Sequence, residues 1–340
     1  MPDSRSTSRS VRRVTWSLGV SPEVLTEYAG TSLRAYYTDA RTMLCTQLES
    51  ARRFRELYGV EVVSPHVATP AYVGVAALGG EVIFPEDDSP MVANQGRVLP
   101  TDASVARLRV PTPDDSPLLQ RQLDMRHFFE AETGRRPCIG AGQEGPITSA
   151  VLLRGERFLM DLLEAPHLTH HLLDVVTETY IAFVRYVRAI NSDAASGVGL
   201  ADDFAGLIAP SMWPEFVVPY WQRLFEALGP GRRVVHSELL RRGHLRYLAE
   251  LGVDHFDPGV DQYLTAGEIA EEIAIPFTEY IWPVRDLLLG TPESIRRQYS
   301  EYVEVGVAHV DADVSCRGIP QENIRAFIAV AREYESMRPG

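Results

Sequence analysis

The sequence predicts a (β/α)8 barrel with an N-terminal helical extension. From about residue 60, short strand patterns alternate with helix patterns, which indicates parallel strands joined by helical crossovers. Polar residues recur just after the strand patterns, and in a barrel all of these strand ends meet on one face. An open, doubly wound sheet is the competing architecture. It should carry a Gly-rich phosphate loop, and neither a Gly-x-Gly-x-x-Gly nor a Walker sequence occurs.

The length of 340 residues fits one barrel domain. Residues 1–13 are polar and basic and lack apolar anchors, which predicts a flexible tail. Residues 14–340 are expected to form a single (β/α)8 barrel domain with N-terminal helices. Within it, we expect the barrel to span roughly residues 55–335, with the N-terminal helices packed on it.

Composition excludes several classes of protein. The formal net charge of −13 disfavours nucleic acid or an anionic membrane surface as the main partner. No apolar run approaches the ~20 residues that a membrane helix needs, and no signal-peptide core follows the N-terminus. The three cysteines, Cys45, Cys138 and Cys316, are far apart and odd in number. A disulfide framework is therefore not expected, and a cytoplasmic location is.

The elements follow one another in a regular order. Residues 22–58 look helical, and a long helix is predicted after Thr38-Asp39 that ends at Gly59. Pro219 should kink the helix that contains it. Further helices are predicted over residues 118–133, 155–163, 167–191, 211–228, 239–251, 265–273, 292–304 and 322–333. Strand patterns occur at residues 60–66, 81–84, 137–140, 197–201, 232–236, 253–258, 276–280 and 306–316.

His236 and Glu238 follow the buried strand pattern Val234-Val235, two residues apart. If the strand geometry persists, they share a side, where an imidazole and a carboxylate can hold a metal or move a proton. A core histidine and a capping glutamate are the alternative. In the metal-binding interpretation, His236, Glu238 and Cys316 would supply three protein ligands to Zn²⁺ and leave one position open. The alternative for Cys316 is a small buried hydrophobic residue.

Other polar residues at strand ends are candidates for substrate contact. Asp202 and Asp203 directly follow a strand pattern, where they can orient a substrate or act as acid or base, or cap a helix. The remaining candidates for substrate binding are His66, Gln143, Glu144, Asp257 and Tyr280. We expect one cavity near the metal to be lined by Gln143, Glu144, Asp202, Asp257 and Tyr280.

A set of motifs carries a resemblance to a known family. The motifs are Gly145-Pro146-Ile147-Thr148, Leu153-Arg154-Gly155, Ala201-Asp202-Asp203, residues 207–213 with Pro219-Tyr220, the His236 strand, residues 248–254, Cys316-Arg317-Gly318-Ile319-Pro320 and Glu322-Asn323-Ile324-Arg325. With them, residues 145–332 resemble the uroporphyrinogen decarboxylase superfamily, on the branch of zinc-dependent corrinoid methyltransferases. Residues 37–85 resemble the same branch more weakly.

The resemblance implies a (β/α)8 barrel with extra N-terminal helices and a zinc ion bound by a His-x-Cys pair and a distant Cys. His236 stands at the position of the His, and Cys316 at that of the distant Cys. Glu238 replaces the paired Cys. A carboxylate is a harder ligand than a thiolate and leaves zinc more Lewis-acidic, which would suit a methoxy compound as well as a thiol. It also leaves open another metal, or none.

The predicted function is methyl transfer between a corrinoid (methylcobalamin) and a small thiol or methoxy substrate, as in O-demethylation. True uroporphyrinogen decarboxylases carry an N-terminal motif of the Arg-Gln-Ala-Gly-Arg type, and none occurs here. A metal-free decarboxylase and a non-catalytic barrel that binds a small ligand are the alternatives. We expect a partner protein to carry the corrinoid, because one barrel leaves no room for a cobalamin domain. The methyl donor, the acceptor and the oligomeric state stay open, with a homodimer as one expectation.

Overall fold

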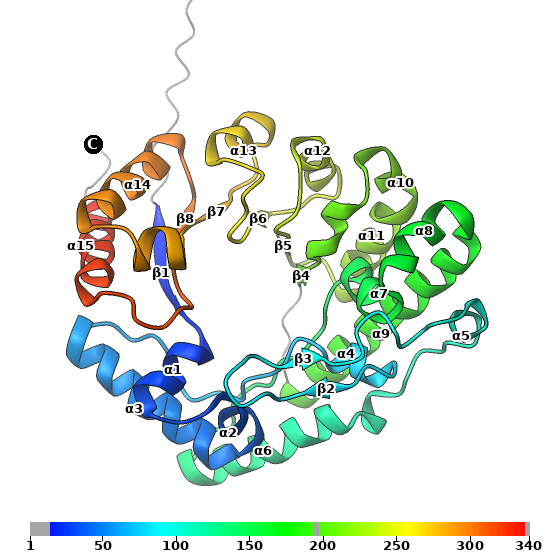
Figure 1. Ribbon diagram of the computed structural model, residues 1–340, viewed down its shortest axis with the longest axis horizontal. Helices are drawn as coiled ribbons and strands as arrows, with labels where there is room; N and C mark the ends of the chain where they lie inside the picture. The colour runs from blue at the N-terminus through cyan, green and yellow to red at the C-terminus, as the bar shows by residue number, and fades with distance from the viewer. Residues whose placement is uncertain (1–13, 193–196, 337–340) are drawn as a thin grey trace, which may run out of the picture.

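The computed structural model of the protein describes residues 14–192 and 197–336 and shows a (β/α)8 barrel (Figure 1). Six parallel strands follow one another around it in the order β4-β5-β6-β7-β8-β1, with β6 and β7 joined by the single bridge Phe256–Phe277. These strands are β1 (Thr15–Val20), β4 (Gly197–Ala201), β5 (Arg232–His236), β6 (His255–Asp257), β7 (Thr278–Ile281) and β8 (His309–Val314). A separate antiparallel pair consists of β2 (Val82–Ile83) and β3 (Met91–Val92).

Helices surround the strands (Figure 1). The α-helices are α1 (Pro22–Ala29), α2 (Leu33–Thr38), α3 (Ala40–Tyr58), α4 (Val73–Ala77), α5 (Asp102–Ala106), α6 (Pro117–Thr133), α7 (Pro146–Arg154), α8 (Glu156–Glu164), α9 (Pro166–Asn191), α10 (Trp213–Phe216), α11 (Val218–Leu228), α12 (Arg242–Glu250), α13 (Ala266–Glu272), α14 (Pro292–Val305) and α15 (Gln321–Ser336). Helical turns of other types are η1 (Pro113–Asp115), η2 (Asp203–Leu207), η3 (Pro210–Met212) and η4 (Pro283–Leu288).

Most of the predicted helices are confirmed, and local chemistry explains where they end. The Asp39 carboxylate accepts a hydrogen bond from the Thr42 N–H and caps α3, which ends at Gly59 in the left-handed conformation (φ 66°). The predicted kink near Pro219 is a break at Val217 that separates α10 from α11. Pro219 lies in the first turn of α11, where its missing N–H costs nothing.

The predicted N-terminal boundary of the barrel is wrong. β1 begins at Thr15 and pairs in parallel with β8 along its whole length, so the barrel does not start near residue 55. Residues 60–66 and 137–140 form no strand, and residues 81–84 contribute to the β2–β3 pair outside the barrel ladder. Pro65 and Pro137 lack the N–H that a ladder needs. The predicted tail, residues 1–13, lies outside the described residues.

Extended chain takes the place of strands between β1 and β4. The Gly140 N–H donates to the Thr69 hydroxyl at 3.2 Å. The Gly145 N–H donates to the carbonyl of Ala201, the last residue of β4, at 2.6 Å. The segment around residues 140–145 therefore lies between the chain near Thr69 and β4 and is held there by isolated hydrogen bonds.

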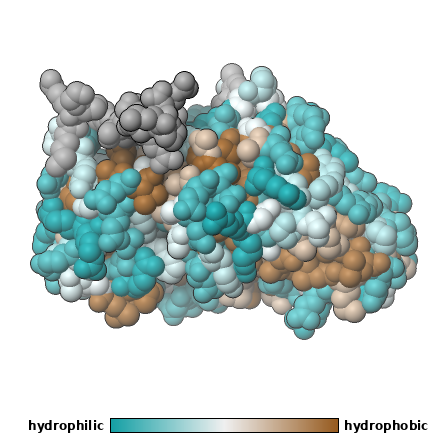
Figure 2. Space-filling model, turned by 90° about the horizontal axis from the view of Figure 1, so that it is seen from above, coloured by the Kyte–Doolittle hydropathy of each residue, from teal (hydrophilic) through white to brown (hydrophobic). Residues whose placement is uncertain are grey.

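The hydrophobic core lies between the strands and the helices. In β8, Val310, Ala312 and Val314 are buried and belong to the same cluster as Phe327 of α15. Figure 2 shows a mostly hydrophilic surface on one face of the molecule, with separate hydrophobic areas. Among the described residues, no helix is both long and apolar enough to cross a membrane.

The alternate residues of the strands point into the barrel, and many are polar. Ser17 of β1 hydrogen-bonds both His309 and Asp311 of β8, so these three side chains share the inner side. Barrels of this class usually fill their interior with branched apolar side chains. Here polar side chains such as Ser17, His309 and Asp311 lie inside the barrel as well.

Candidate functional site

A cluster of polar side chains lies at the carboxyl ends of β4, β5, β6 and β7, where (β/α)8 barrels carry their active sites. His236 is the last residue of β5, and the parallel register places it beside Ala201 of β4 and Asp257 of β6. Because its side chain points inward, it meets groups from both neighbouring strands. We define the carboxyl-end cluster as Glu144, Asp203, His236, Glu238, Asp257 and Tyr280.

The His236 imidazole lies between two carboxylates. Its Nδ1 is 3.1 Å from Asp257 Oδ2, and its Nε2 is 3.6 Å from Asp203 Oδ1. The Tyr280 hydroxyl donates to the same Asp257 oxygen at 3.1 Å. About a third of the His236 side chain is exposed (32%), so the ring is held in place and remains accessible. Asp257 thus orients the imidazole and leaves Nε2 available for a substrate.

The surroundings of His236 favour its charged form. Burial opposes the charge, but the hydrogen bond with Asp257 and the charges of Asp257, Asp203 and Glu238 raise the pKa of His236 to about 9. Burial likewise opposes ionisation of Asp257, but His236 and the donors from Gly259 and Tyr280 hold the pKa of Asp257 below its usual value. At neutral pH the pair is an imidazolium and a carboxylate.

Further carboxyl groups lie beside His236, so the cluster holds more carboxyl groups than cations. The Glu238 N–H donates to Asp203 Oδ1 at 3.1 Å, which fixes the loop after β5 against the end of β4. Burial and the charge of Asp203 raise the pKa of Glu238. Burial, with the charges of Asp203 and Asp202, raises the pKa of Glu144 to about 8. Glu144 can therefore hold a proton at neutral pH.

Asp202 has a structural role, whereas its neighbour Asp203 faces His236. Its side chain is fully buried and accepts hydrogen bonds from the N–H groups of Ile147 (3.2 Å) and Thr148 (2.7 Å) and from Trp221 Nε1 (2.8 Å). It therefore holds the N-terminus of α7, which corresponds to the helix-capping alternative. A Cβ on Gly145 would lie 2.4 Å from Asp202 Cγ, so this contact explains the glycine.

The sequence analysis missed Gly259, which shapes the cluster. It has φ of +62°, and a Cβ there would lie 2.6 Å from Glu238 Cγ and 2.9 Å from His236 Cε1. Only glycine lets the chain pass this close to both side chains. A glycine two residues after Asp257, just past a strand pattern, is the signal that could have found it.

Two predicted substrate-binding residues lie away from this cluster. His66 is exposed, and its Nδ1 is 2.9 Å from the Ser64 carbonyl in its own loop. Gln143 donates to the Ala141 carbonyl at 2.7 Å and packs against Gly74 of α4. It lines a cavity in the barrel wall together with Tyr180 and Gly199. The structure shows neither side chain in contact with His236.

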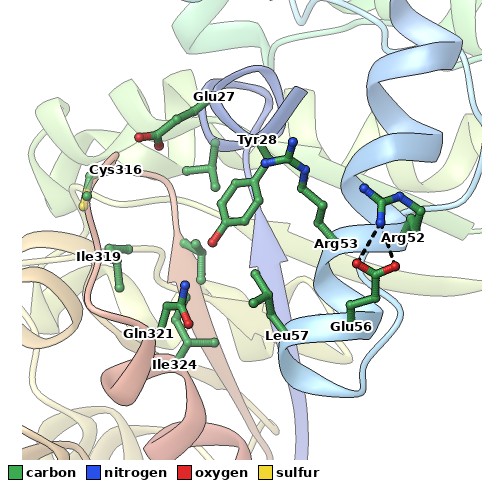
Figure 3. A pocket seen from close by; sticks show the side chains of 13 residues that line it. Glu27, Tyr28, Arg52, Arg53, Glu56, Leu57, Cys316, Ile319, Gln321 and Ile324 are labelled. Carbon is green, nitrogen blue, oxygen red and sulfur yellow. Dashed lines mark hydrogen bonds and ion pairs between the residues drawn. The ribbon is translucent and has the colours of Figure 1, made fainter. Parts of the chain in front are cut away.

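Cys316 lines a groove of about 600 Å³ between α1, α3 and the start of α15 (Figure 3). Its thiol donates to the Pro283 carbonyl at 3.4 Å. Burial and the charges of Asp313 and Glu27 raise the pKa of Cys316. Among the described residues, no three His, Cys, Asp or Glu side chains are arranged to hold a metal ion. The structure thus does not bring Cys316 together with His236 and Glu238.

Comparison with known proteins identifies the family. A model of the family "Uroporphyrinogen decarboxylase (URO-D)" matches residues 12–334. The chain belongs to the URO-D family. Relatives named uroporphyrinogen decarboxylase include those of Xanthomonas campestris (26% identity over 240 residues, 67% of this chain) and Xylella fastidiosa (25% over 234 residues, 65% of this chain). The matches span 65% and 63% of the lengths of those relatives.

A solved structure shows the same fold over nearly the whole chain. It is a methyltransferase from Methanosarcina mazei, with a TM-score of 0.72 and 20% sequence identity. The match covers 96% of this chain and 94% of the other. Members of the URO-D family and a solved methyltransferase thus share this barrel architecture, and the choice between their chemistries depends on the residues of the site.

Proposed function

We propose that the protein is a methyltransferase that moves a methyl group between a corrinoid and a small thiol or methoxy substrate at the carboxyl-end cluster. The observation that carries this proposal is the placement of His236 between Asp203 and Asp257, with Glu144 and Glu238 beside them. This arrangement offers one oriented proton donor in an acidic environment. It suits a neutral substrate whose leaving atom must be protonated.

The charge of the cluster argues against decarboxylation of a polycarboxylate. Uroporphyrinogen carries several carboxylates, and their recognition needs well-placed cations. The charges that act on His236 come from Asp257, Asp203 and Glu238, and those that act on Glu144 come from Asp203, Asp202 and His236. His236 is the only cation among these groups. A substrate with several carboxylates would be repelled here, whereas a methyl ether or a thiol would not.

The chemistry of the chain's own residues follows from this geometry. Asp257 and Tyr280 hold the imidazolium through Nδ1, so Nε2–H, on the side of Asp203, is the ring proton left for a substrate. When the methyl group leaves a methoxy substrate, Nε2–H can protonate the departing oxygen. Asp203 Oδ1, 3.6 Å from Nε2, helps to keep the ring charged. Glu144 can return the proton.

The zinc and the corrinoid stay predictions. Cys316 lies in a separate groove, so the three residues His236, Glu238 and Cys316 do not fit one zinc ion in this structure, and no step here depends on it. A corrinoid, when bound, supplies the cobalt that accepts or donates the methyl group. A partner that carries it would have to approach the carboxyl end of the barrel, because the cluster lies there.

The test is a methyl-transfer assay on the purified full chain. Cob(I)alamin is offered with a panel of methoxy aromatic compounds, and in the reverse direction methylcobalamin is offered with small thiols. Both are followed by the absorbance of the cobalamin. We expect transfer in at least one direction, and a loss of about 10²–10⁴-fold in His236→Gln, the range for removal of a general acid. His309→Gln, at the other end of the barrel, is the matched control and should retain activity.

A second candidate function is decarboxylation, which the names of the relatives favour. The same preparation is therefore incubated with uroporphyrinogen, and release of carbon dioxide is measured. Decarboxylation that requires His236, without any methyl transfer, would replace the proposed function. Metal analysis of the protein purified with added zinc completes the experiment, because stoichiometric zinc would support the sequence-based ligand set.

A further inference from the structure

The other end of the barrel carries a polar cavity. It has a volume of about 330 Å³ and is lined at the amino-terminal ends of the strands by Thr15, Arg232, His255, Thr278 and His309, with Val234, Pro276 and Ala308. We call it the amino-terminal mouth. Its volume lies within the range of small-molecule sites. It is separate from the carboxyl-end cluster, which contains none of these residues.

Strand register builds the amino-terminal mouth. Thr15 of β1, His309 of β8 and Thr278 of β7 are direct neighbours across the parallel ladders. His255 of β6 continues the row, because its Nε2 is 2.8 Å from the Thr278 hydroxyl. Four side chains from four consecutive strands therefore form one inward-facing row. Since they stand on barrel strands, their positions are fixed before any ligand arrives.

Hydrogen bonds leave His255 with an uncommitted ring nitrogen. Both nitrogens of His309 are engaged, Nδ1 with the Thr15 hydroxyl (2.8 Å) and Nε2 with the Ser17 hydroxyl (2.8 Å). His255 uses only Nε2 among the residues that the structure describes. When Thr278 donates its hydroxyl proton to Nε2, Nδ1 carries the hydrogen. His255 can then donate to a ligand in the mouth.

Arg232 gives the amino-terminal mouth a cation. Its side chain is exposed at the first residue of β5, and no carboxylate within residues 14–192 and 197–336 lies at ion-pair distance from it. Burial is the main cause that lowers the pKa of His255, and the charge of the nearby Arg232 is the second. Asp257 and Asp311 stand two residues further along their strands, inside the barrel. The cation is thus at the outer edge of the cavity.

We propose that the amino-terminal mouth binds a small oxyanion, held by the Arg232 guanidinium and the His255 ring. A guanidinium offers two parallel N–H groups to a phosphate or carboxylate, and an imidazole N–H adds a third donor. The acidic groups further inside keep the anion at the edge and prevent it from entering the barrel. The site is independent of the methyl transfer proposed above, and its test measures the binding of an anion and does not depend on enzymatic activity.

The experiment measures binding of inorganic phosphate, and of acetate as the carboxylate probe, to the full chain by isothermal titration calorimetry. Ionic strength is kept constant with sodium chloride, because general screening would otherwise imitate binding. We expect one saturable site for at least one of the two anions. Arg232→Gln should weaken it about 10- to 100-fold, the effect of losing a charged hydrogen-bond pair. The exposed Arg232 makes no contact that folding requires.

A matched control and a second readout decide the outcome. Arg297→Gln removes the same charge from an exposed site on α14 (72% exposed) and should leave binding unchanged. Ring ¹⁵N signals of the histidines are recorded during the titration, and His255 should shift while His236 does not. The proposal is overturned if neither anion binds saturably, if the two arginine variants bind equally, or if His255 does not respond.

Discussion

Histidines occur at both ends of this barrel, but their partners give them different charges, positive at one end and neutral at the other. At the carboxyl end, His236 lies between Asp257 and Asp203, and its pKa rises to about 9. At the amino-terminal mouth, His255 and His309 hydrogen-bond the hydroxyls of Thr278 and Thr15, and burial lowers the pKa of both rings. Rings from the same barrel interior are thus an acid at one end and neutral donors or acceptors at the other.

The difference shows that the partner of a histidine decides its chemistry. A carboxylate at 3.1 Å offsets the cost of burying an imidazolium, whereas a hydroxyl does not. The carboxyl end can therefore supply protons, and the amino-terminal mouth can only hold a ligand.

Asp257→Asn should have the largest effect, because it removes the carboxylate that orients and charges His236. The pKa of His236 should fall by about 1–3 units, the usual effect of an adjacent opposite charge. Methyl transfer should fall by about 10³-fold, since the general acid is lost. The pKa is measured by NMR titration of the histidine ring signals. Tyr280→Phe removes only the hydroxyl that supports Asp257 and should cost much less; equal losses would contradict the assigned role of Asp257.

Asp202→Asn tests the structural support of the carboxyl end. The buried carboxylate accepts three N–H donors, and an amide would leave at least one of them facing another N–H group. The free energy of unfolding should fall by about 2–4 kcal/mol, measured by denaturant titration. Asp203→Asn is the same change one residue along, at a partly exposed side chain, and should alter stability by less than about 1 kcal/mol. Similar losses in both variants would contradict this distinction.

Glu279→Gln tests how burial controls protonation near the carboxyl end. Glu279 is buried, and this raises its pKa to about 8. The folded state therefore binds a proton that the unfolded state releases above about pH 4.5, so stability should fall as pH rises from about 5 to 8. Glutamine stays neutral, and the variant should lose less stability over this range, by on the order of 1–2 kcal/mol. The exposed Glu304→Gln should keep the wild-type slope; a variant of Glu279 with that same slope would refute the prediction.

Sequence patterns were enough for the barrel and for half of the site. The His236 strand, Asp257 and Tyr280 could be placed because each polar residue lies at or near the end of a recognisable strand pattern. β1 was missed because its inward residues Thr15, Ser17 and Gly19 are small and polar and follow a polar, basic segment. Spacing along a strand identifies residues that share a face. It was therefore sufficient to bring together residues on strands that are neighbours in the ladder.

Contacts between distant loops could not be predicted in the same way. Asp202 and Asp203 are adjacent and chemically identical, yet one is buried against α7 and the other faces His236. Sequence alone could not decide which of the two carboxylates caps α7 and which faces His236. The position of Cys316 depends on how the loop after β8 runs relative to α1 and α3. No local pattern reports the path of that loop.

Cys316→Ala should have the smallest effect, because its thiol lies in the groove beside α1 and makes one weak hydrogen bond, to the Pro283 carbonyl. Stability should change by less than about 1 kcal/mol, the usual range for a partly exposed side chain. The zinc content and methyl-transfer rate should equal those of the wild type if the thiol stays in this groove. Both are measured on protein purified with added zinc, with Cys45→Ala as the control for removal of an exposed thiol. Loss of zinc and activity in Cys316→Ala alone would show that the loop after β8 turns inward to bind metal, and Glu238→Cys should then retain the ion.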